Sequence, residues 1–89
     1  MTRMNELVMF NGKVVCPRCD GNGLLYKAKV TDLGNQMIYI CDECEASWQD
    51  NIPIRRDTFE DLSTYLEKKG CNYRDAEIVN LGYDWYMNS

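Results

Sequence analysis

Two short runs in the first half of the chain have the alternation typical of β-strands. Residues 24 to 30, LLYKAKV, place hydrophobic side chains at 24, 26, 28 and 30 and interleave them with Leu25, Lys27 and Lys29. A period of two puts successive side chains on opposite faces of a strand. Residues 37 to 40, MIYI, form a second β-rich run, and TDLGNQ between the runs supplies turn residues. We therefore expect an antiparallel hairpin whose lysines lie on the solvent side.

The second half of the chain contains one segment with helical periodicity, residues 58 to 69. Phe59, Leu62 and Leu66 recur at spacings of three and four, and Tyr65 lies at the margin of this narrow stripe. We expect the stripe to cover one face of the hairpin sheet.

Both ends of this predicted helix carry terminal signals. Asp57 suits the N-cap position, and Glu60, three residues on, suits the reciprocal partner of a capping box. Gly70 suits the position that follows the C-cap.

The C-terminal residues fit two structures. Residues 72 to 82 fit a short helix capped by Asn72, whereas AEIVNL at 76 to 81 fits a strand, and we favour the helix. Tyr83, Trp85 and Tyr86 then crowd the chain end, where they either fold back onto the core or remain available for contacts. The sequence leaves this choice open.

Four of the five cysteines form two pairs with the same spacing. Two residues separate Cys16 from Cys19 and Cys41 from Cys44, and 21 residues lie between the pairs. Two tight turns, each offering two sulfurs about 2.3 Å from one ion, suit a tetrahedral metal site. Four sulfur ligands leave no open coordination position, so we predict one structural Zn²⁺ held by these four cysteines.

Unligated thiols and a redox pair both fit the cysteine pattern less well than a metal site. Free cysteines are often small buried side chains, and a redox pair would need a βαβ pattern around it, which is missing here. Pro17, Gly21 and Gly23 instead favour a tight turn around the first pair. Cys71 lies far along the chain, and we expect it to be a core or surface residue, not a fifth ligand.

Composition limits the size and the class of the protein. With 89 residues, 45% of them hydrophobic, the chain suits one small domain, residues 1 to 89, with a metal-binding part at about 1 to 52 and a helical, aromatic extension at 53 to 89. We find no apolar run long enough for a membrane span and no signal peptide at the start of the sequence. We therefore expect a cytoplasmic protein in a reducing compartment.

Charge and the absence of histidine narrow the function. The formal net charge is −4 with no histidine, and four thiolates with one Zn²⁺ would bring it to about −6. Such a chain is repelled by phosphate backbones, so direct binding of nucleic acid is not expected, and a basic partner is favoured. Without histidine the commonest general acid and base is missing, and we expect no enzyme.

CPRCDGNG at 16 to 23 and CDEC at 41 to 44 resemble the two knuckles of the zinc-ribbon family over roughly residues 10 to 50. The resemblance implies an α+β fold, a small zinc ribbon with an antiparallel hairpin sheet, packed by a C-terminal helical segment. Asp20 and Glu45 depart from the glycine that many ribbons carry after each knuckle. The first knuckle also fits the CxxCxGxG repeat of DnaJ-type chaperones, but CDECEASW lacks both glycines.

The ensemble CPRCDGNG, YKAKV, IYICDECEASW and DLSTYLEKKG is similar to small bacterial ribbon proteins, some of which belong to toxin–immunity systems, including contact-dependent growth inhibition. This resemblance implies a monomeric immunity protein that binds one cognate toxin domain, expected to be a basic nuclease. It does not indicate which residues touch the toxin. Charge and aromatic character select these candidates: Asp42, Glu43, Glu45, Trp48, Asp50, Asp57, Glu60 and Asp61.

Two other functions remain open. A ribbon of transcription or translation would contact nucleic acid or polymerase through Lys13, Arg18, Lys27, Lys29, Arg55 and Arg56, but these bases are scattered among acids. An adaptor inside a larger enzyme complex is the third possibility. The candidate residues could also have no binding role. The acids could simply form a solvent-exposed face, and Trp48 could be a core residue beside the metal.

Overall fold

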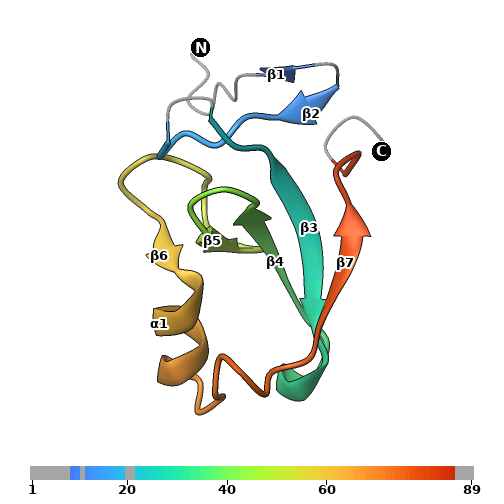
Figure 1. The fold of residues 1–89 in the computed structure, drawn as a ribbon, viewed down its shortest axis with the longest axis vertical. Coiled ribbons are helices and arrows are strands. Elements are labelled where there is room, and N and C mark those ends of the chain that lie inside the picture. Colours follow the sequence, from blue (N-terminus) through green and yellow to red (C-terminus); the bar gives the residue numbers. More distant parts are fainter. Residues whose placement is uncertain (1–8, 11, 20–21, 86–89) are drawn as a thin grey trace.

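A five-stranded antiparallel sheet with the strand order β6-β5-β4-β3-β7 forms the centre of the structure, a computed structural model that describes residues 9–10, 12–19 and 22–85 (Figure 1). Its strands are β3 (Leu25–Val30), β4 (Gln36–Cys41), β5 (Ala46–Gln49), β6 (Glu60–Asp61) and β7 (Ile78–Gly82). A separate two-stranded hairpin joins β1 (Met9–Phe10) to β2 (Lys13–Val14). Gly21 and Tyr86 lie outside the described residues, as do Asp20 and the start of the chain.

The predicted hairpin is confirmed. β3 and β4 pair antiparallel from Leu25 opposite Cys41 to Val30 opposite Gln36, so the hairpin runs directly into the second cysteine pair. The connection is the 3₁₀ turn η1 (Thr31–Leu33) followed by Gly34 and Asn35 at φ of 70° and 66°. A residue with this left-handed backbone favours glycine or asparagine, which explains the TDLGNQ turn.

One face of the sheet is covered by the helix α1 (Leu62–Lys68), as predicted. The buried cluster between them consists of Ala28, Val30, Ile38, Ile40, Leu62, Tyr65 and Leu66. Tyr65 is 2% exposed, so it lies inside this core and not at its margin. Phe59 precedes the helix and packs near Trp48, with ring centroids 6.4 Å apart, so it does not belong to the helical stripe.

The helix begins four residues later than the sequence predicts. Glu60 and Asp61 pair with β5 as the short strand β6, and the hydroxyl of Ser47 donates to the carbonyl oxygen of Glu60 at 2.7 Å. The N-cap is therefore Asp61, without a side-chain capping bond, and the prediction of Asp57 and Glu60 as a capping box is wrong. Pairing with a neighbouring strand outweighs the local capping signal here.

The predicted end of the helix is confirmed. Gly70 has φ of 84°, and its N–H donates to the carbonyl of Glu67 at 3.0 Å, while the N–H of Cys71 donates to Leu66 at 2.8 Å. This pair of bonds is the Schellman motif, which suits glycine because of the left-handed backbone.

No helix of the described residues is long and apolar enough to cross a membrane.

The C-terminal segment is a strand, so the predicted helix over 72 to 82 is wrong. β7 pairs with β3, placing Ile78 opposite Val30 and Val79 opposite Lys29. Two adjacent β-branched residues fit the open edge of β3, where the sheet supplies hydrogen bonds that a short isolated helix would lack. Asn72 does cap a single turn, because its side chain accepts from the N–H of Arg74 at 2.9 Å.

The described aromatic residues near the C-terminus fold back onto the sheet. The indole N–H of Trp85 donates to the carbonyl of Leu25 at 3.0 Å, and its ring lies 4.3 Å from that of Tyr39. The ring of Tyr83 lies 5.7 Å from that of Tyr26. Both tail side chains are half-buried, so they are partly core and partly surface.

A second buried cluster lies at the cysteine end of the sheet and contains Val14, Cys16, Leu25, Cys41, Ala46 and Trp48. Leu25 is fully buried there, although the alternation predicts it on the solvent side with the two lysines. The sheet also spans the predicted division near residue 52, because β6 and β7 come from the extension and form both of its edges.

Candidate metal centre and its surroundings

The hairpin brings the two cysteine pairs together. The sulfur atoms of Cys16, Cys19, Cys41 and Cys44 all lie within 4.8 Å of one another. The Cys16–Cys44 and Cys19–Cys41 sulfur distances are 3.8 and 3.6 Å. Four sulfurs at about 2.3 Å from a tetrahedral ion would be about 3.8 Å apart, so these four side chains could hold one metal ion. Cys71 is outside this cluster and packs beside the helix core.

Backbone N–H groups point at the sulfurs in both turns. The N–H of Arg18 lies 3.3 Å from Cys16 Sγ, and those of Glu43 and Cys44 lie 3.3 and 3.4 Å from Cys41 Sγ. Such donors stabilise negative charge on sulfur, because hydrogen bonds to the charged form favour it. Both turns therefore place hydrogen-bond donors where a thiolate would accept them, against the effect of burial.

Gly23 closes the first turn against the second. The N–H of Cys16 donates to the carbonyl of Gly23 at 2.9 Å, and a Cβ on Gly23 would collide with Cys41 Sγ. The N–H of Leu24 donates to the Asp42 carboxylate at 3.0 Å, so the two turns are also bonded directly. Glycine is therefore required at position 23 because there is no room for a side chain beside the Cys41 sulfur.

The pKa values of Cys16, Cys41 and Cys44 are shifted in different directions. Burial raises the pKa of Cys16 and raises that of Cys41 to about 11. Burial also opposes ionisation of Cys44, but the backbone N–H of Ala46 and the guanidinium of Arg18 outweigh it and lower the pKa of Cys44 to about 7. The Arg18 guanidinium lies 4.7 Å from the centre of the Phe59 ring, so it bridges the metal centre and the segment that precedes β6.

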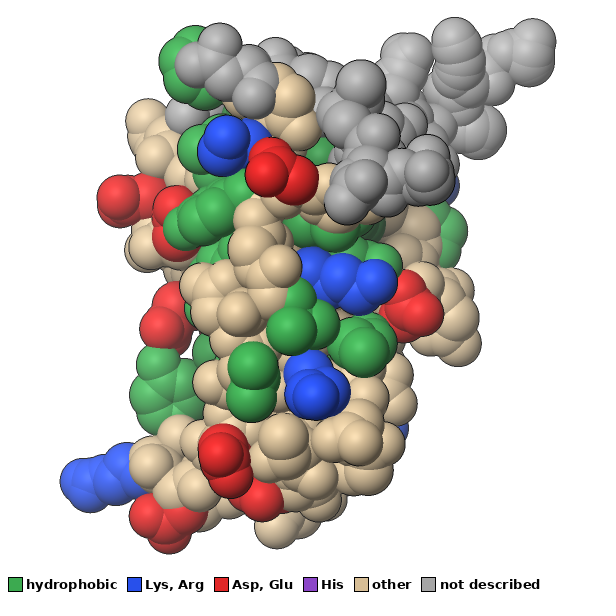
Figure 2. All heavy atoms as spheres, turned by 90° about the vertical axis from the view of Figure 1, so that its right-hand side faces the viewer, with side chains coloured by type: hydrophobic (Ala, Val, Ile, Leu, Met, Phe, Trp, Pro, Cys, Tyr) green, Lys and Arg blue, Asp and Glu red, His purple; other side chains and the backbone are tan. Residues whose placement is uncertain are grey.

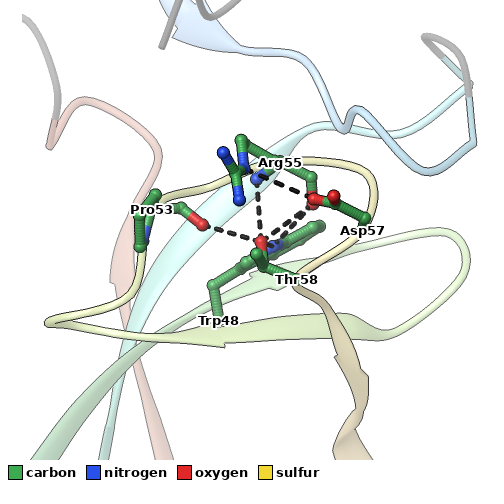
Figure 3. Close-up of polar contacts among 5 residues, drawn as sticks. All are labelled: Trp48, Pro53, Arg55, Asp57 and Thr58. Carbon is green, nitrogen blue, oxygen red and sulfur yellow. Dashed lines mark hydrogen bonds and ion pairs between the residues drawn. The ribbon is translucent and has the colours of Figure 1, made fainter. Parts of the chain in front are cut away.

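Trp48 is a core residue. It is 1% exposed, and its indole N–H donates to the carbonyl of Arg55 at 3.0 Å and to the Thr58 hydroxyl at 3.1 Å (Figure 3). The Thr58 hydroxyl donates to the carbonyl of Pro53 at 2.7 Å and accepts from the N–H of Arg55 at 3.1 Å. This network folds the loop after β5 over the indole, so Trp48 has no surface with which to touch a macromolecular partner across an interface.

The remaining candidate acids do not form one patch. Asp50 accepts from the Tyr39 hydroxyl at 2.7 Å, Asp57 pairs with Arg55 at 3.3 Å, and Glu60 pairs with Lys68 at 2.7 Å. Tyr39 lies on the sheet face opposite Tyr26, because Tyr26 is paired with Ile40 and successive side chains alternate. Glu43 and Asp61 are exposed.

Asp42 and Glu45 have tyrosine neighbours that the sequence did not point to. The Tyr83 hydroxyl donates to Asp42 at 3.0 Å, and the Tyr73 hydroxyl donates to Glu45 at 2.7 Å. The charges of both acids reach Tyr26 as well, where burial and then these charges raise its pKa. We call these five residues the acid–tyrosine surface. The three tyrosines are far from the two acids along the chain, so no sequence spacing could have indicated that they would meet.

Glu45 has an unusual backbone. Its φ is 59°, the left-handed conformation that favours glycine and is uncommon for a side chain of this size. Its N–H donates to the carbonyl of Cys41 at 3.1 Å, and its carbonyl accepts from Leu62 at 3.0 Å, so the metal turn and the start of α1 hold it there. A strained residue that its surroundings hold in place is a functional candidate.

Comparison with known proteins finds no match, whether to a protein family, to a curated protein or to a solved structure.

Proposed function

We propose that this chain is a non-catalytic immunity protein that binds and neutralises the basic toxin domain of its own system, a nuclease, through the acid–tyrosine surface. The observation that carries the proposal is Glu45, an exposed carboxylate at a backbone position that favours glycine, held by a tyrosine hydroxyl at 2.7 Å. A chain that served only to fold would be more stable with glycine there. The conformational cost of a glutamate at this position supports a role for its carboxylate in binding.

One Zn²⁺ is the metal we propose for the four cysteines. An all-sulfur set at tetrahedral spacing suits zinc, and with four protein ligands the ion has no position left for water or substrate. Its contribution is folding free energy, as in other structural zinc sites. The protein would then act by surface contact from a zinc ribbon, in the cytoplasm where the toxin arrives, and as a monomer with one toxin.

The acid–tyrosine surface suits a cationic partner. A nuclease active site must attract phosphate, so it presents clustered positive charge, which carboxylates on a facing surface complement. Tyrosines add contact area at low entropic cost and bind cations over their rings. The pKa of Tyr73 is raised by its hydrogen bond to Glu45, and that of Tyr83 by burial and then by Asp42, so both phenols remain neutral donors at physiological pH.

Nucleic acid is the less supported target. Of the six candidate bases, Arg55 pairs with Asp57, Lys13 lies 3.9 Å from Asp84, and Lys27 lies over the Tyr39 ring. Figure 2 shows basic side chains on one face separated by hydrophobic and acidic ones, without a continuous stripe among the described residues. A phosphate backbone needs such a stripe.

The Glu45→Gly variant distinguishes the effect of this residue on toxin binding from its effect on stability. We expect the Glu45→Gly variant to melt at the same or a higher temperature, because it relieves a backbone cost of about 1 kcal/mol, and to bind the toxin domain at least about tenfold more weakly. The partner to test is the toxin domain encoded next to this gene, with kinetics measured at several salt concentrations and survival of cells that produce it. The association rate should fall as salt rises.

Glu67→Gln is the matched control, since it removes an exposed charge of α1 that is not one of the five residues of the proposed surface. It should leave both binding and protection unchanged. Equal binding by the Glu45→Gly variant, or tight salt-sensitive binding of the wild-type protein to generic DNA or RNA with none to the neighbouring toxin, would contradict the proposal.

A further inference from the structure

The strand β7 forms one edge of the five-stranded sheet, and β6 forms the other. The β6 edge consists of the two acidic residues Glu60–Asp61 and leads directly into α1. The β7 edge, Ile78–Gly82, is five residues long and contains neither a charged residue nor a proline. Natural edge strands are commonly protected from further pairing by short length, charge or proline. The β6 edge has the first two of these protections, whereas β7 has none of the three.

The backbone of β7 faces outward at two positions. The N–H of Thr31 donates to the carbonyl of Glu77 at 3.1 Å, so the backbone of residue 77 faces β3. Val79 also faces β3, because backbone groups point to alternate sides along an antiparallel strand. Ile78 and Asn80 therefore direct their N–H and carbonyl groups away from the sheet, where no strand of the described residues pairs with them. An added strand could form hydrogen bonds with these four groups.

A bulge limits the length of this pairing. Asn80 and Gly82 lie opposite successive residues of β3, so Leu81 between them has no partner there. Such an extra residue increases the local twist of the strand. Leu81 is 45% exposed, and Figure 2, which shows the side of the molecule on which β7 lies, has hydrophobic side chains at the surface among acidic and basic ones. An added strand would pair with the part of β7 that precedes the bulge and end over Leu81.

The β7 edge is continuous with the acid–tyrosine surface. Tyr83 directly follows β7, and its hydroxyl donates to Asp42 at 3.0 Å. The ring of Tyr83 also lies 5.7 Å from that of Tyr26 on β3. From Tyr83 back to Asn80 the chain covers about 10 Å, at about 3.3 Å per residue. One macromolecular partner can therefore contact both the acid–tyrosine surface and the outward backbone groups of β7.

Charge favours a basic segment at this edge. Glu77 directly precedes β7, Asp84 follows it by two residues, and both are exposed. Lys13 lies 3.9 Å from Asp84, but exposed ion pairs of this kind are weak. The lysines of β3 are separated from the edge by β7 itself. A complementary strand would carry basic residues at its ends and apolar residues between them.

We propose that the toxin domain adds a short basic strand to β7, pairing with the outward N–H and carbonyl groups of Ile78 and Asn80. The proposal rests on the proposed function, since it assigns a second contact to the same partner. In strand addition, main-chain hydrogen bonds supply affinity and side chains supply specificity. The acid–tyrosine surface then recognises the charge of the toxin, and the β7 edge recognises an extended segment of its backbone.

Amide hydrogen exchange, measured for each residue of the zinc-loaded protein by NMR, tests this pairing. In the free protein the N–H groups of Ile78 and Asn80 should exchange fast, whereas that of Val79, which faces β3, should exchange slowly. In the complex with the toxin domain encoded next to this gene, Ile78 and Asn80 should exchange as slowly as Val79, at least about tenfold slower than before. Loss of the alternation is a signature of strand addition that a contact through side chains alone would not produce.

The Leu81→Lys variant tests the edge by binding. It places a positive charge where the basic strand would end, and lysine is a residue that protects natural edges from pairing. We expect about tenfold weaker toxin binding and an unchanged melting temperature, because Leu81 is exposed. Phe10→Lys is the matched control, since Phe10 is 60% exposed in the separate β1–β2 hairpin, and this variant should bind as the wild type does.

The outcomes are separable from those of the proposed surface. If Ile78 and Asn80 still exchange fast in the toxin complex, or if Leu81→Lys binds as tightly as Phe10→Lys, the strand proposal is wrong, although the toxin could still bind through Glu45. Normal binding by Glu45→Gly with weak binding by Leu81→Lys would support the edge and contradict the acid–tyrosine surface.

Two further results would contradict the strand proposal. A toxin-free protein that is dimeric, with slow exchange at both outward amides, would show that a second copy occupies the edge. A wild-type protein that does not bind the neighbouring toxin would contradict the immunity function and the added strand together.

Discussion

The Cys41→Ser variant is expected to lose its metal and, with it, the folded sheet. Cys41 Sγ lies 3.6 Å from Cys19 Sγ and accepts two backbone N–H groups, and the residue is fully buried in the second core cluster. A serine hydroxyl does not ionise at neutral pH and is a poor zinc ligand. Structural zinc supplies about 10 kcal/mol or more of apparent folding free energy, comparable with the whole stability of a domain, about 5–15 kcal/mol.

Metal content per chain and the near-ultraviolet circular dichroism of Trp48 and its neighbours measure this loss. Cys71→Ser is the control, because Cys71 is half-buried beside the helix core and outside the sulfur cluster. It should retain one zinc and a cooperative thermal transition. A Cys41→Ser protein that keeps a cooperative transition after chelation would show that the cysteines are ordinary core residues.

The Gly23→Ala variant is expected to weaken metal binding although it changes no ligand. The added Cβ would collide with Cys41 Sγ and lie 2.9 Å from the Cβ of Glu43, so one of the turns must move. Moving a sulfur away from tetrahedral position costs affinity, and overpacking of this kind typically costs about 1–3 kcal/mol. We expect a lower melting temperature and loss of zinc to a chelator that is about 5- to 150-fold faster, which is the cost of about 1–3 kcal/mol converted to a ratio.

Asn22→Ala provides the matched control, since its side chain is exposed and its backbone bond to Cys19 is kept. That variant should release zinc at the wild-type rate. Equal release by Gly23→Ala would mean that the turns do not need to approach each other this closely.

The cluster of four cysteines and the central hairpin could be predicted because their signals are local. Each cysteine pair is specified within four residues, and the alternation between 24 and 30 is complete within one strand. The hairpin turn then brings the pairs together without any other part of the chain. Short-range pattern and long-range contact agree at this end of the molecule.

The start of the helix and the last strand could not be predicted, because the edges of the sheet decide them. Residues 58 to 61 carry a reasonable helical stripe, yet Glu60 and Asp61 pair with β5. Residues 76 to 81 suit either structure, and the open edge of β3 selects the strand. Both outcomes depend on pairing with a strand from another part of the chain. The periodicity of a single segment carries no information about that pairing.

The candidate binding residues show the same limit. The ring of Trp48 and its acidic neighbours suggest an interface, but a hydroxyl ten residues later, Thr58, binds the indole and the loop covers it. Tyr26 and Tyr73, which the structure brings to Glu45, carry no signal as a pair in the sequence. Side-chain type indicates what a residue can bind, whereas its neighbours in space decide whether it is accessible.

The placement of both sheet edges in the last third of the chain has a consequence for synthesis. All four cysteines of the cluster precede residue 45, whereas β6 and β7 begin at residues 60 and 78. A nascent chain leaving the ribosome can therefore assemble this cysteine cluster, and bind the proposed ion there, while β3 and β5 still have unpaired outer edges. Early ion capture would fix the hairpin register before the flanking strands arrive, and would shorten the time in which bare flanks can join another polypeptide.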